Sequence, residues 1–385
     1  MYILVKMMPK RLLDMGIILS LIIFALFQAP VFAIESELVV TLFKAHQPNN
    51  CLYIAAPFKI SRGVQREFRS GVYEIKRDSG RFILQSKLHM NESAVYIAGT
   101  KLDIQPLGDY VRIGFKPDAI RKYRGKIDIL AEGNALLCLN QVRMKDYVAS
   151  VLGSETALDF PLEALKAQSV LIQTSMHRYK LNDELFDSTD KQAYLGADYE
   201  RPRVIQAMQA TWDQSLRYKS RLVPVFFHSS CAGGTSSSEL FTGLKPELAC
   251  DTPVACRYCE NAPFWKSTKK RVSREKYDIK FPEGVPQVSS KDSSGRPQML
   301  RYKNGKEERA YSFWLRVGQQ LGWDKLPGTR FDIHREPDGD VVLSSTGAGH
   351  GVGLCQWGAC GLAKTGASYE KILQYYFPGS TLAKH

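Results

Sequence analysis

The period of the hydrophobic pattern changes near residue 143 of this 385-residue chain, and this change constrains the fold more than any other feature of the sequence. From Glu37 to about Val142, short segments rich in β-branched and aromatic residues are separated by Gly, Asn and Asp, as in LVVTLF, RFILQ, YVRIGF and KIDILA. Such segments are typical of β-strands linked by turns. The first part of the chain is therefore predicted to be β-rich.

Helical spacing begins directly afterwards. Apolar residues recur at the interval of one helix face, at Met144, Tyr147, Val148, Val151 and Leu152. Further helices are predicted over residues 161–176, 204–216, 313–322 and 369–377. The predicted fold class is α+β: a β-rich N-terminal module, residues 34–122, joined to a mixed core, residues 123–385, whose helices flank a cleft. Residues 245–310, rich in Pro, Ser, Gly and charge, are predicted to be a loop-rich insertion with little core of its own.

The N-terminal segment reads as a targeting sequence. It has a basic start, an apolar run from Met15 to Phe27, and a small-residue ending at Ala33, which is the pattern of a signal peptide over residues 1–33. The apolar run is shorter than the roughly 20 residues that a membrane-spanning helix needs. An uncleaved N-terminal anchor is the alternative. In either case the rest of the chain is expected to be exported, to the periplasm or to the outer face of the cytoplasmic membrane.

The net charge narrows the choice of partners. The chain carries a formal charge of +13, and the leader accounts for little of it, with three basic residues and one acid. A basic exported protein is expected to meet anionic surroundings, such as a membrane face or a cell-wall polymer. Export makes nucleic acid the least suitable of the anionic partners. A membrane is expected to be a partner only through the N-terminal segment, if that segment is not cleaved.

One acid, Glu155, continues the apolar stripe of the first helix, four residues after Val151. If the helix persists, the carboxyl group faces the packed side at the negative end of the helix dipole, and both effects raise its pKa. A raised pKa suits a general acid near neutral pH. An exposed loop carboxylate is the alternative. The nearby acids are weaker candidates, because Asp159 suits a helix cap and Glu163 can pair with Lys166 one turn on.

One histidine and three cysteines form two short pairs about 25 residues apart, His228 with Cys231 and Cys256 with Cys259. These ligand types and this pairing match a closed tetrahedral zinc site. A disulfide among Cys250, Cys256 and Cys259 is the alternative, because an exported chain lies in an oxidising compartment. A zinc ion with four protein ligands has no open position, so it would be structural.

A glycine-rich segment, GAGHGVGLCQWGACGLAKTG, covers residues 347–366. Its glycines let the backbone approach a ligand, and His350, Gln356 and Trp357 provide hydrogen-bonding groups beside an aromatic ring, as sugar sites do. It is not a phosphate loop, because no Gly-Lys-Ser/Thr follows the glycines. A plain structural turn is the alternative.

Four segments, in this order, resemble the motifs of the stage II sporulation protein D (SpoIID) family of exported cell-wall enzymes. VLGSETALDFPLEALKAQSV is similar to the family's SEMP…WP-x-EALKAQAV signature, and DSTDKQAYLG to its D-x-T-x-x-Q-x-Y-x-G stretch. FFHSSCAGGTSSSE resembles H-S-x-x-GG-x-T, and GHGVGLCQWGA resembles the closing GHGVGMSQWGA block. The resemblance spans roughly residues 123–379 and is weakest over 245–310.

The resemblance implies lytic transglycosylase action on peptidoglycan strands whose stem peptides have been removed. Such enzymes cleave the β-1,4 bond between N-acetylmuramic acid and N-acetylglucosamine and leave a 1,6-anhydro end. The family's catalytic acid falls on Glu155. The expected substrate contacts are Lys166, Gln168, Gln192, Tyr194, Ser229, His350, Gln356 and Trp357. The resemblance also favours a structural zinc ion on His228, Cys231, Cys256 and Cys259. Peptidoglycan glycan strands are the expected partner, together with a cell-wall amidase or the division machinery.

The chain departs from the family pattern in places that matter. The Met-Pro after the acid is Thr156-Ala157 here, and the family's Arg-Thr-Tyr appears as Gln173-Thr174-Ser175. The loss of that arginine raises a second hypothesis, a non-catalytic peptidoglycan-binding protein that recruits or activates a cell-wall amidase. Cys355 and Cys360 stand where the family has other residues, and they either form a local disulfide or remain free. A zinc peptidase is disfavoured, because there is no HExxH motif.

Overall fold

The computed structural model describes residues 37–62, 65–88, 93–157, 159–179, 184–188 and 192–384. The predicted signal peptide, residues 1–33, lies outside these ranges. The chain divides into two units, Met1–Glu37 and Leu38–His385. Within the described ranges no helix has the length and apolar character needed to cross a membrane. The structure contains both helices and many strands, so the predicted α+β class is confirmed.

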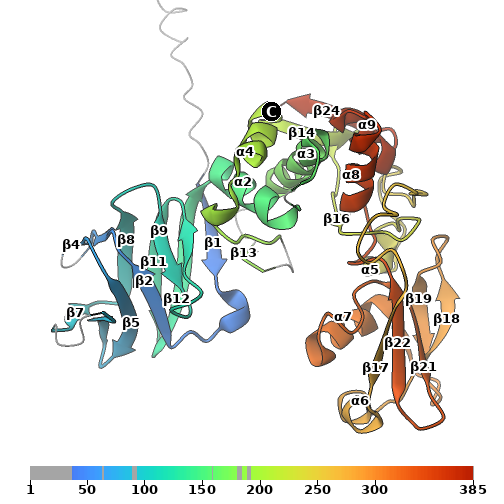
Figure 1. Cartoon of the computed structure of the whole chain (residues 1–385), viewed down its shortest axis with the longest axis horizontal. Coiled ribbons are helices and arrows are strands. Elements are labelled where there is room, and N and C mark those ends of the chain that lie inside the picture. The colour runs from blue at the N-terminus through green and yellow to red at the C-terminus, as the bar shows by residue number, and fades with distance from the viewer. Residues whose placement is uncertain are drawn as a thin grey trace, which may run out of the picture. The chain divides into compact units, whose positions relative to one another are not determined.

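Two sheets form a sandwich in the N-terminal part of the second unit (Figure 1). The strands of the first sheet, in spatial order, are β13 (Leu185–Phe186), β1 (Glu37–Leu42), β12 (Ala135–Arg143), β11 (Lys126–Glu132), β8 (Lys101–Pro106), β3 (Phe58–Ile60) and β4 (Arg66–Phe68). Those of the second are β10 (Arg121–Tyr123), β9 (Val111–Gly114), β2 (Cys51–Ala55), β5 (Val72–Asp78), β6 (Arg81–Ser86) and β7 (Val95–Ala98). A 3-10 turn, η2 (Lys44–His46), follows β1. Buried residues alternate along most strands, and those of both sheets belong to one hydrophobic cluster.

The strands of the β-rich part continue past residue 122 to Arg143, in line with the strand-like segments up to about Val142. Strand β11 pairs along its length with β8 and with β12, and its Ile127 and Ile129 lie opposite Ile104 and Leu102. Strands β11 and β12 therefore complete the first sheet. The predicted domain boundary at residue 122 marks where the family resemblance begins, whereas the alternating apolar residues continue to Val142.

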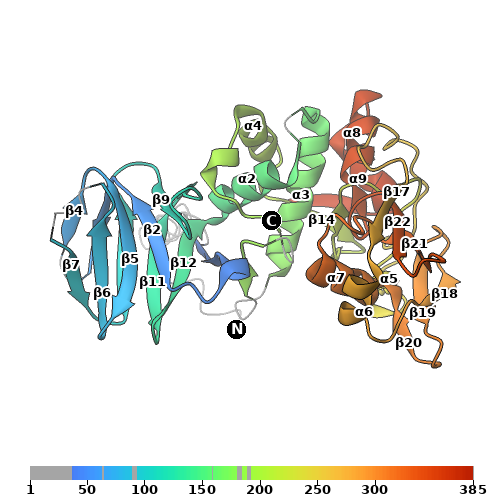
Figure 2. The ribbon, with the colours of Figure 1, turned by 60° about the horizontal axis from the view of Figure 1, so that its bottom comes forward.

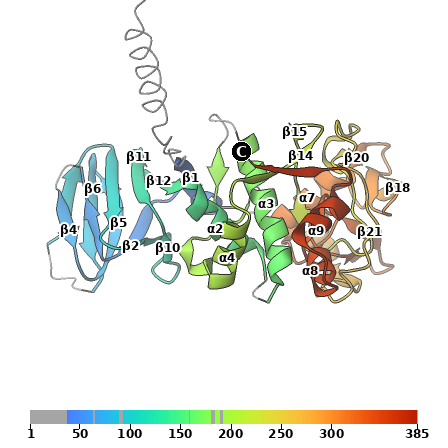
Figure 3. The same ribbon diagram turned by 90° about the horizontal axis from the view of Figure 1, so that it is seen from above.

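A helical layer follows, and α3 (Leu162–Arg178) lies at its centre. Helix α3 contacts α2 (Met144–Glu155), α4 (Pro202–Ala210), α8 (Gln356–Lys364) and α9 (Tyr369–Tyr376). Figure 3 shows α3 between α2 and α4 on one side and α8 and α9 on the other. Because α3 has neighbours on several sides, most of its residues are buried.

The predicted helix over residues 204–216 is shorter in the structure. Helix α4 ends at Ala210, and the chain turns through Asp213, whose φ is 66°, in the left-handed region. Strand β14 (Gln214–Tyr218) then pairs with β15 (Arg221–Leu222) and with the C-terminal strand β24 (Thr381–Lys384). Leu216, the last apolar residue of the predicted helix, is instead buried in strand β14.

Residues 268–346 form a further group of elements with its own core (Figure 2). They comprise two three-stranded sheets, β17 (Thr268–Val272), β22 (Val341–Thr346) and β21 (Arg330–Arg335), and β18 (Gln287–Lys291), β19 (Pro297–Arg301) and β20 (Glu307–Arg309), with helices α6 (Arg274–Lys280) and α7 (Ala310–Leu321). Buried Phe281, Phe313 and Leu343 lie in this core. The prediction of a loop-rich insertion over 245–310 therefore describes only its irregular first part. The strands between residues 268 and 310 were not predicted because they are short and mostly exposed. Strand β17, for example, buries only Val272.

Candidate active site and cysteine cluster

Glu155 is the last residue of α2. Among the described residues its carboxylate accepts one hydrogen bond, from the backbone N–H of Ala193 at 2.5 Å, and it has no cationic partner. Burial raises the pKa of Glu155, and the Ala193 hydrogen bond opposes that rise only in part. The direction of the pKa shift agrees with the prediction from the helical spacing.

The segment that carries Ala193 is fastened along α2. The N–H of Leu195 donates to Oγ of Ser154 at 3.2 Å, and Oγ of Ser150 donates to the carbonyl of Gly196 at 3.0 Å. Gly196 has a φ of 87°, and a Cβ at this position would overlap the carbonyl oxygen of Lys122. A glycine is therefore required where this segment, residues 192–196, passes against β10 and turns along the helix.

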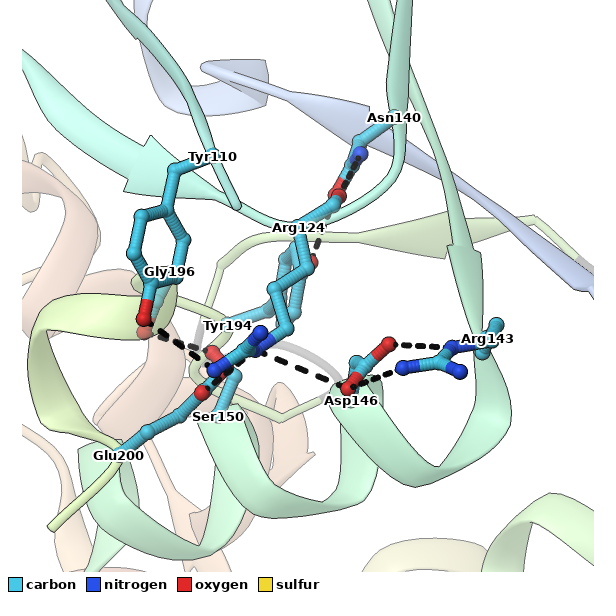
Figure 4. Close-up of polar contacts among 9 residues, drawn as sticks. All are labelled: Tyr110, Arg124, Asn140, Arg143, Asp146, Ser150, Tyr194, Gly196 and Glu200. Atoms are coloured by element: carbon cyan, nitrogen blue, oxygen red, sulfur yellow. Dashed lines mark hydrogen bonds and ion pairs between the residues drawn. The ribbon is translucent and has the colours of Figure 1, made fainter. Parts of the chain in front are cut away.

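Tyr194 anchors the same segment to the sandwich (Figure 4). Its hydroxyl donates to Oδ1 of Asn140 on β12 at 2.6 Å, and Nδ2 of Asn140 donates to the carbonyl of Arg124 at 2.9 Å. The Tyr194 ring stacks on that of Tyr147 of α2, with centroids 5.1 Å apart. Only 1% of Tyr194 is exposed. The structure therefore places Tyr194 between α2 and the sandwich, where it supports residues 192–196, and its predicted contact with a sugar stays a prediction.

A charged network continues from Arg124 (Figure 4). Its Nε donates to Glu200 at 2.7 Å, and its guanidinium lies 4.8 Å from the centroid of the Tyr110 ring. Asp146, in the first turn of α2, lies 3.7 Å from Arg124 and accepts from Arg143 at 2.8 Å. Glu200 directly follows the short 3-10 turn η3 (Ala197–Tyr199). The network therefore connects the sandwich, the start of α2 and the chain just beyond residues 192–196.

Other residues that were predicted to bind substrate approach Glu155 from helix α8. Nε2 of Gln356, the first residue of α8, donates to the backbone carbonyl of Glu155 at 3.0 Å. The next residue, Trp357, lies edge-on to Phe160 with ring centroids 5.5 Å apart, and its N–H donates to the carbonyl of Ser229 at 3.1 Å. Glu155, Gln356, Trp357 and Ser229, which the sequence predicted to act together, are thus brought together in the structure.

The two predicted substrate residues of α3 have other surroundings. Nζ of Lys166 pairs with Glu163 at 2.6 Å, and the second oxygen of Glu163 accepts the N–H of Tyr369 at 2.9 Å, which joins α3 to α9. Gln168 is 1% exposed, and its amide group has no hydrogen-bond partner among the described residues. Gln192 is also buried. Lys166 thus serves a helix–helix contact, and Gln168 and Gln192 are enclosed.

Gln173, which replaces the family arginine, is completely buried in α3. Its Nε2 donates to the carbonyl of Thr211 at 2.9 Å, and its Oε1 accepts the N–H of Asp213 at 2.8 Å. These bonds fix the turn between α4 and β14. Gln173 therefore supports the packing of α3, and none of its hydrogen bonds involves the residues around Glu155.

The sulfur atoms of four cysteines converge in the interior: Cys231, Cys256, Cys259 and Cys355. All four are buried, all four thiols are free, and their Sγ atoms lie within 4.8 Å of one another. Those of Cys231 and Cys259 are 3.5 Å apart, near the edge of about 3.8 Å that four sulfurs form around zinc at 2.3 Å. This cysteine cluster has the donor set and the spacing for a metal ion held by four thiolates.

His228, predicted as the fourth ligand, is not a member of the cluster. Its Nδ1 lies 3.0 Å from the carbonyl of Val352, and its ring packs beside that of His350. Cys355 takes the fourth place because strand β16 (Phe227–His228) pairs in parallel with β23 (Leu354–Cys355). Cys355 lies about a hundred residues beyond Cys259, so spacing alone gave no sign of it. The local disulfide between Cys355 and Cys360 is not formed.

Hydrogen-bond donors lie close to two sulfur atoms of the cysteine cluster. The N–H groups of Cys231 and Gly358 each lie 3.3 Å from Sγ of Cys355, and the hydroxyl of Tyr376 lies 3.2 Å from Sγ of Cys256. Hydrogen bonds from neighbouring thiols, above all that of Cys231, lower the pKa of Cys259, whereas burial raises the pKa of Cys355. Such donors stabilise thiolates, the form that binds metal.

A buried arginine ties the loop after Cys231 to the group of elements at 268–346. Arg296 is 1% exposed and donates to the carbonyls of Cys231 at 2.7 Å and Gly234 at 2.6 Å. A Cβ on Gly351 would overlap its guanidinium, so the glycine-rich segment also packs against it closely. The core of residues 268–346 thereby supports the backbone of the cysteine cluster.

Comparison with known proteins agrees with these features. A family profile described as "Stage II sporulation protein" matches residues 132–218, from the last strands of the sandwich through Glu155 to β14. The stage II sporulation protein D of Bacillus subtilis is 25% identical over 272 residues, which cover 64% of this chain and 76% of that protein. The profile and this relative support membership of the stage II sporulation protein D family. An uncharacterised protein of Brachyspira hyodysenteriae is 29% identical over 303 residues, 76% of this chain and 78% of its own.

A further relative of this chain carries a different name. It is called "Amidase enhancer", comes from Bacillus subtilis, and is 23% identical over 284 residues. The match covers 61% of this chain but only 40% of that longer protein. The family and this relative together fit a role related to the cell wall.

Proposed function

We propose that the protein is an exported lytic transglycosylase that cleaves peptide-free peptidoglycan strands, with Glu155 as general acid and base. One observation carries the proposal: a partly buried carboxyl group with a raised pKa, one backbone donor, and neither a cation nor a second carboxylate acting on its pKa among the described residues. Ordinary glycosidases need two carboxylates. A single carboxyl group suits a reaction in which the substrate provides its own nucleophile.

In this reaction Glu155 starts protonated and donates its proton to the glycosidic oxygen as the bond to the muramic acid carbon breaks. The 6-hydroxyl of the same muramic acid attacks that carbon, and the carboxylate accepts the hydroxyl proton as the 1,6-anhydro ring closes. Glu155 ends protonated, so the proton balance is complete. The N–H of Ala193 stabilises the carboxylate between the two steps. Gln356 fixes the backbone of Glu155, and Trp357 offers an aromatic face beside it.

The cysteine cluster is proposed to hold a structural zinc ion on Cys231, Cys256, Cys259 and Cys355. Four thiolates leave no open position on zinc, so the ion would fix structure and take no part in the reaction. It would join three chain segments, and one of them continues directly into Gln356 and Trp357.

The proposed substrate is the peptidoglycan glycan strand outside the cytoplasmic membrane, made available by a cell-wall amidase. The second candidate is a non-catalytic peptidoglycan-binding protein that recruits or activates such an amidase. The relative named "Amidase enhancer" favours it. The structural role of Gln173 weakens the sequence argument for it, since that residue has no contact with the proposed acid.

The decisive experiment incubates purified protein with amidase-treated and with intact peptidoglycan, and detects anhydro-muramyl products by mass spectrometry. We expect products from treated strands, and a drop of roughly 10²-fold or more for Glu155→Gln, the usual size of a lost general acid. Asp159→Asn, which removes an exposed acid four residues away, is the matched control and should keep full activity. Absence of products with the unaltered protein, or undiminished products with Glu155→Gln, would overturn the proposal.

A further inference from the structure

A pocket of about 720 Å³ lies at the C-terminal end of α3, next to the turn between β14 and β15 and the segment around α5 (Glu239–Thr242). Its volume is typical of sites that enclose a small molecule or part of a polymer. Basic side chains from three separate segments line it: Arg178, Arg217, Arg221 and Lys245. None of the residues predicted from the sequence belongs to this pocket.

The two acidic residues of the pocket are already engaged. Glu247 pairs with Arg221 at 2.6 Å, and Asp251 accepts the N–H of Ser238 at 3.0 Å. Two guanidinium groups have no carboxylate partner in the described part of the chain. Nη1 of Arg178 donates to the carbonyl of Leu222, and Nη1 of Arg217 to that of Ser220, each at 2.9 Å. Both arginines are therefore held in position with their charge uncompensated, as a site for an anion requires.

Apart from Ser238 and Thr242, the rest of the lining is apolar and aromatic. The rings of Phe226 and Phe241 lie 5.2 Å apart, and the Phe241 ring lies 5.1 Å from that of His350 in the glycine-rich segment. Aromatic faces beside hydrogen-bonding cations suit a sugar that carries an acid. The pocket is thus continuous with the segment that also supplies Gln356 and Trp357.

The pocket is separated from the proposed acid by the length of α3. Arg178 is the last residue of this helix, whose first residue, Leu162, follows the Phe160 that packs on Trp357. At 1.5 Å per residue the helix is roughly 25 Å long. A ligand that reaches both ends must therefore be a polymer of several sugars.

We propose that this pocket binds the free carboxylate of a muramic acid several sugars away from the bond that is cleaved. The inference rests on the proposed function. In an intact strand this carboxyl group forms the amide bond to the stem peptide and carries no charge. Once an amidase has removed the peptide, each muramic acid displays a carboxylate, which the fork of an arginine binds with two hydrogen bonds. Arg178 and Arg217 would thus distinguish peptide-free strands from intact ones.

The test measures binding to peptide-free strands and to the same strands after their carboxylates have been converted to methylamides. We expect the unaltered protein and Glu155→Gln to bind the untreated strands more tightly, with an advantage that shrinks as salt rises. The double substitution Arg178→Ala with Arg217→Ala should lower affinity for untreated strands roughly tenfold and leave amidated strands unaffected. Arg203→Ala, an exposed arginine of α4 outside the pocket, is the control. Thermal unfolding checks that each variant is folded.

Equal affinity for the two kinds of strand, or no effect of the double substitution, would overturn the inference. So would tighter binding of inorganic polyphosphate than of peptide-free strands, because the site would then prefer a phosphate polymer. The anhydro-muramyl assay is scored separately. Products together with carboxylate-independent binding would overturn the pocket alone, whereas carboxylate-dependent binding without products would overturn only the catalytic proposal.

Discussion

The end of α2 around Glu155 and the cysteine cluster are both assembled from segments far apart in sequence, yet their polar groups have opposite surroundings. At Glu155 a chargeable group is buried with one backbone donor, and no cation balances it in the described structure. In the cysteine cluster four sulfur atoms converge on one point, with N–H and O–H groups directed at them. The first arrangement opposes folding when the group ionises, and the second favours folding when it binds a cation.

This difference separates a group suited to react, Glu155, from residues suited to stabilise the fold, the cysteine cluster. A carboxylate buried without a cation costs stability, which is the usual price of a tuned catalytic group. A metal bound by four thiolates adds its binding free energy to folding. Substitutions in the cysteine cluster should therefore act first on stability, and substitutions around Glu155 should act first on activity and its pH dependence.

The largest effect on stability is expected from Cys256→Ser. Protein purified without added zinc should contain one equivalent of metal, and the variant should lose it along with several kcal/mol of unfolding free energy, because a lost ligand forfeits most of the metal's contribution. Metal analysis and thermal unfolding with and without a chelator measure both. Cys360→Ser is the matched control, a buried cysteine outside the cluster. Equal losses in the two variants, or a disulfide at Cys256 in active protein, would contradict the metal proposal.

The second largest effect on stability is expected from Gln173→Arg, which restores the arginine of the family pattern. In the structure Gln173 supports the packing of α3. Replacing its fully hydrogen-bonded amide by a buried, unpaired guanidinium should therefore lower the free energy of unfolding by about 3 kcal/mol without raising turnover. Gln173→Met, which removes the hydrogen bonds but keeps the volume, should cost about 1–2 kcal/mol. Chemical denaturation and the anhydro-muramyl assay measure the two quantities. A gain in activity at unchanged stability would show that Gln173 limits catalysis.

Most of what could be predicted from the sequence came from the period of the hydrophobic pattern. The spacing of Tyr147, Val148 and Val151 predicted the helix that ends at Glu155, and the structure agrees, because helical spacing is a local property. The pairing of Lys166 with Glu163 was also predicted, for the same local reason. The fold class followed from the change of period near residue 143.

Features that depend on tertiary contacts were missed or misassigned. Cys355 reaches the cysteine cluster only through the pairing of β16 with β23, and His228 is displaced from it by its bond to Val352. The hydroxyl of Tyr194 looked available for a sugar but is taken by Asn140 across the sandwich. No motif indicated the pocket at Arg178 and Arg217, because its residues come from three segments. The spacing of residues along the chain does not show which distant segments contact one another in the fold.

A smaller effect is expected from Glu155→Gln on stability. Burial raises the pKa of Glu155 above its unfolded value, so the folded state is penalised increasingly as pH rises from about 4.3, the ordinary pKa of glutamate. The penalty is complete above the folded pKa and absent at low pH. Glu155→Gln should therefore melt at a higher temperature than the unaltered protein at pH 7–8, and the two should converge near pH 4. Asp159→Asn should show no comparable pH-dependent gap; a Glu155→Gln protein that is less stable at pH 8 would contradict the pKa assignment.

The smallest expected effect is that of Tyr194→Phe. Loss of the hydroxyl bond to Asn140 should cost about 1 kcal/mol and loosen residues 192–196, so that the Ala193 N–H is held less firmly on Glu155. Since that N–H lowers the pKa of Glu155, the pKa should rise, and the alkaline fall in activity should move to higher pH. Tyr53→Phe removes a tyrosine hydroxyl bond of similar length, to Glu74 in the sandwich. It should leave the pH profile in place. A shift with Tyr194→Phe alone would show that Asn140 and Tyr194 tune the acid, whereas two unshifted profiles would confine them to holding the fold.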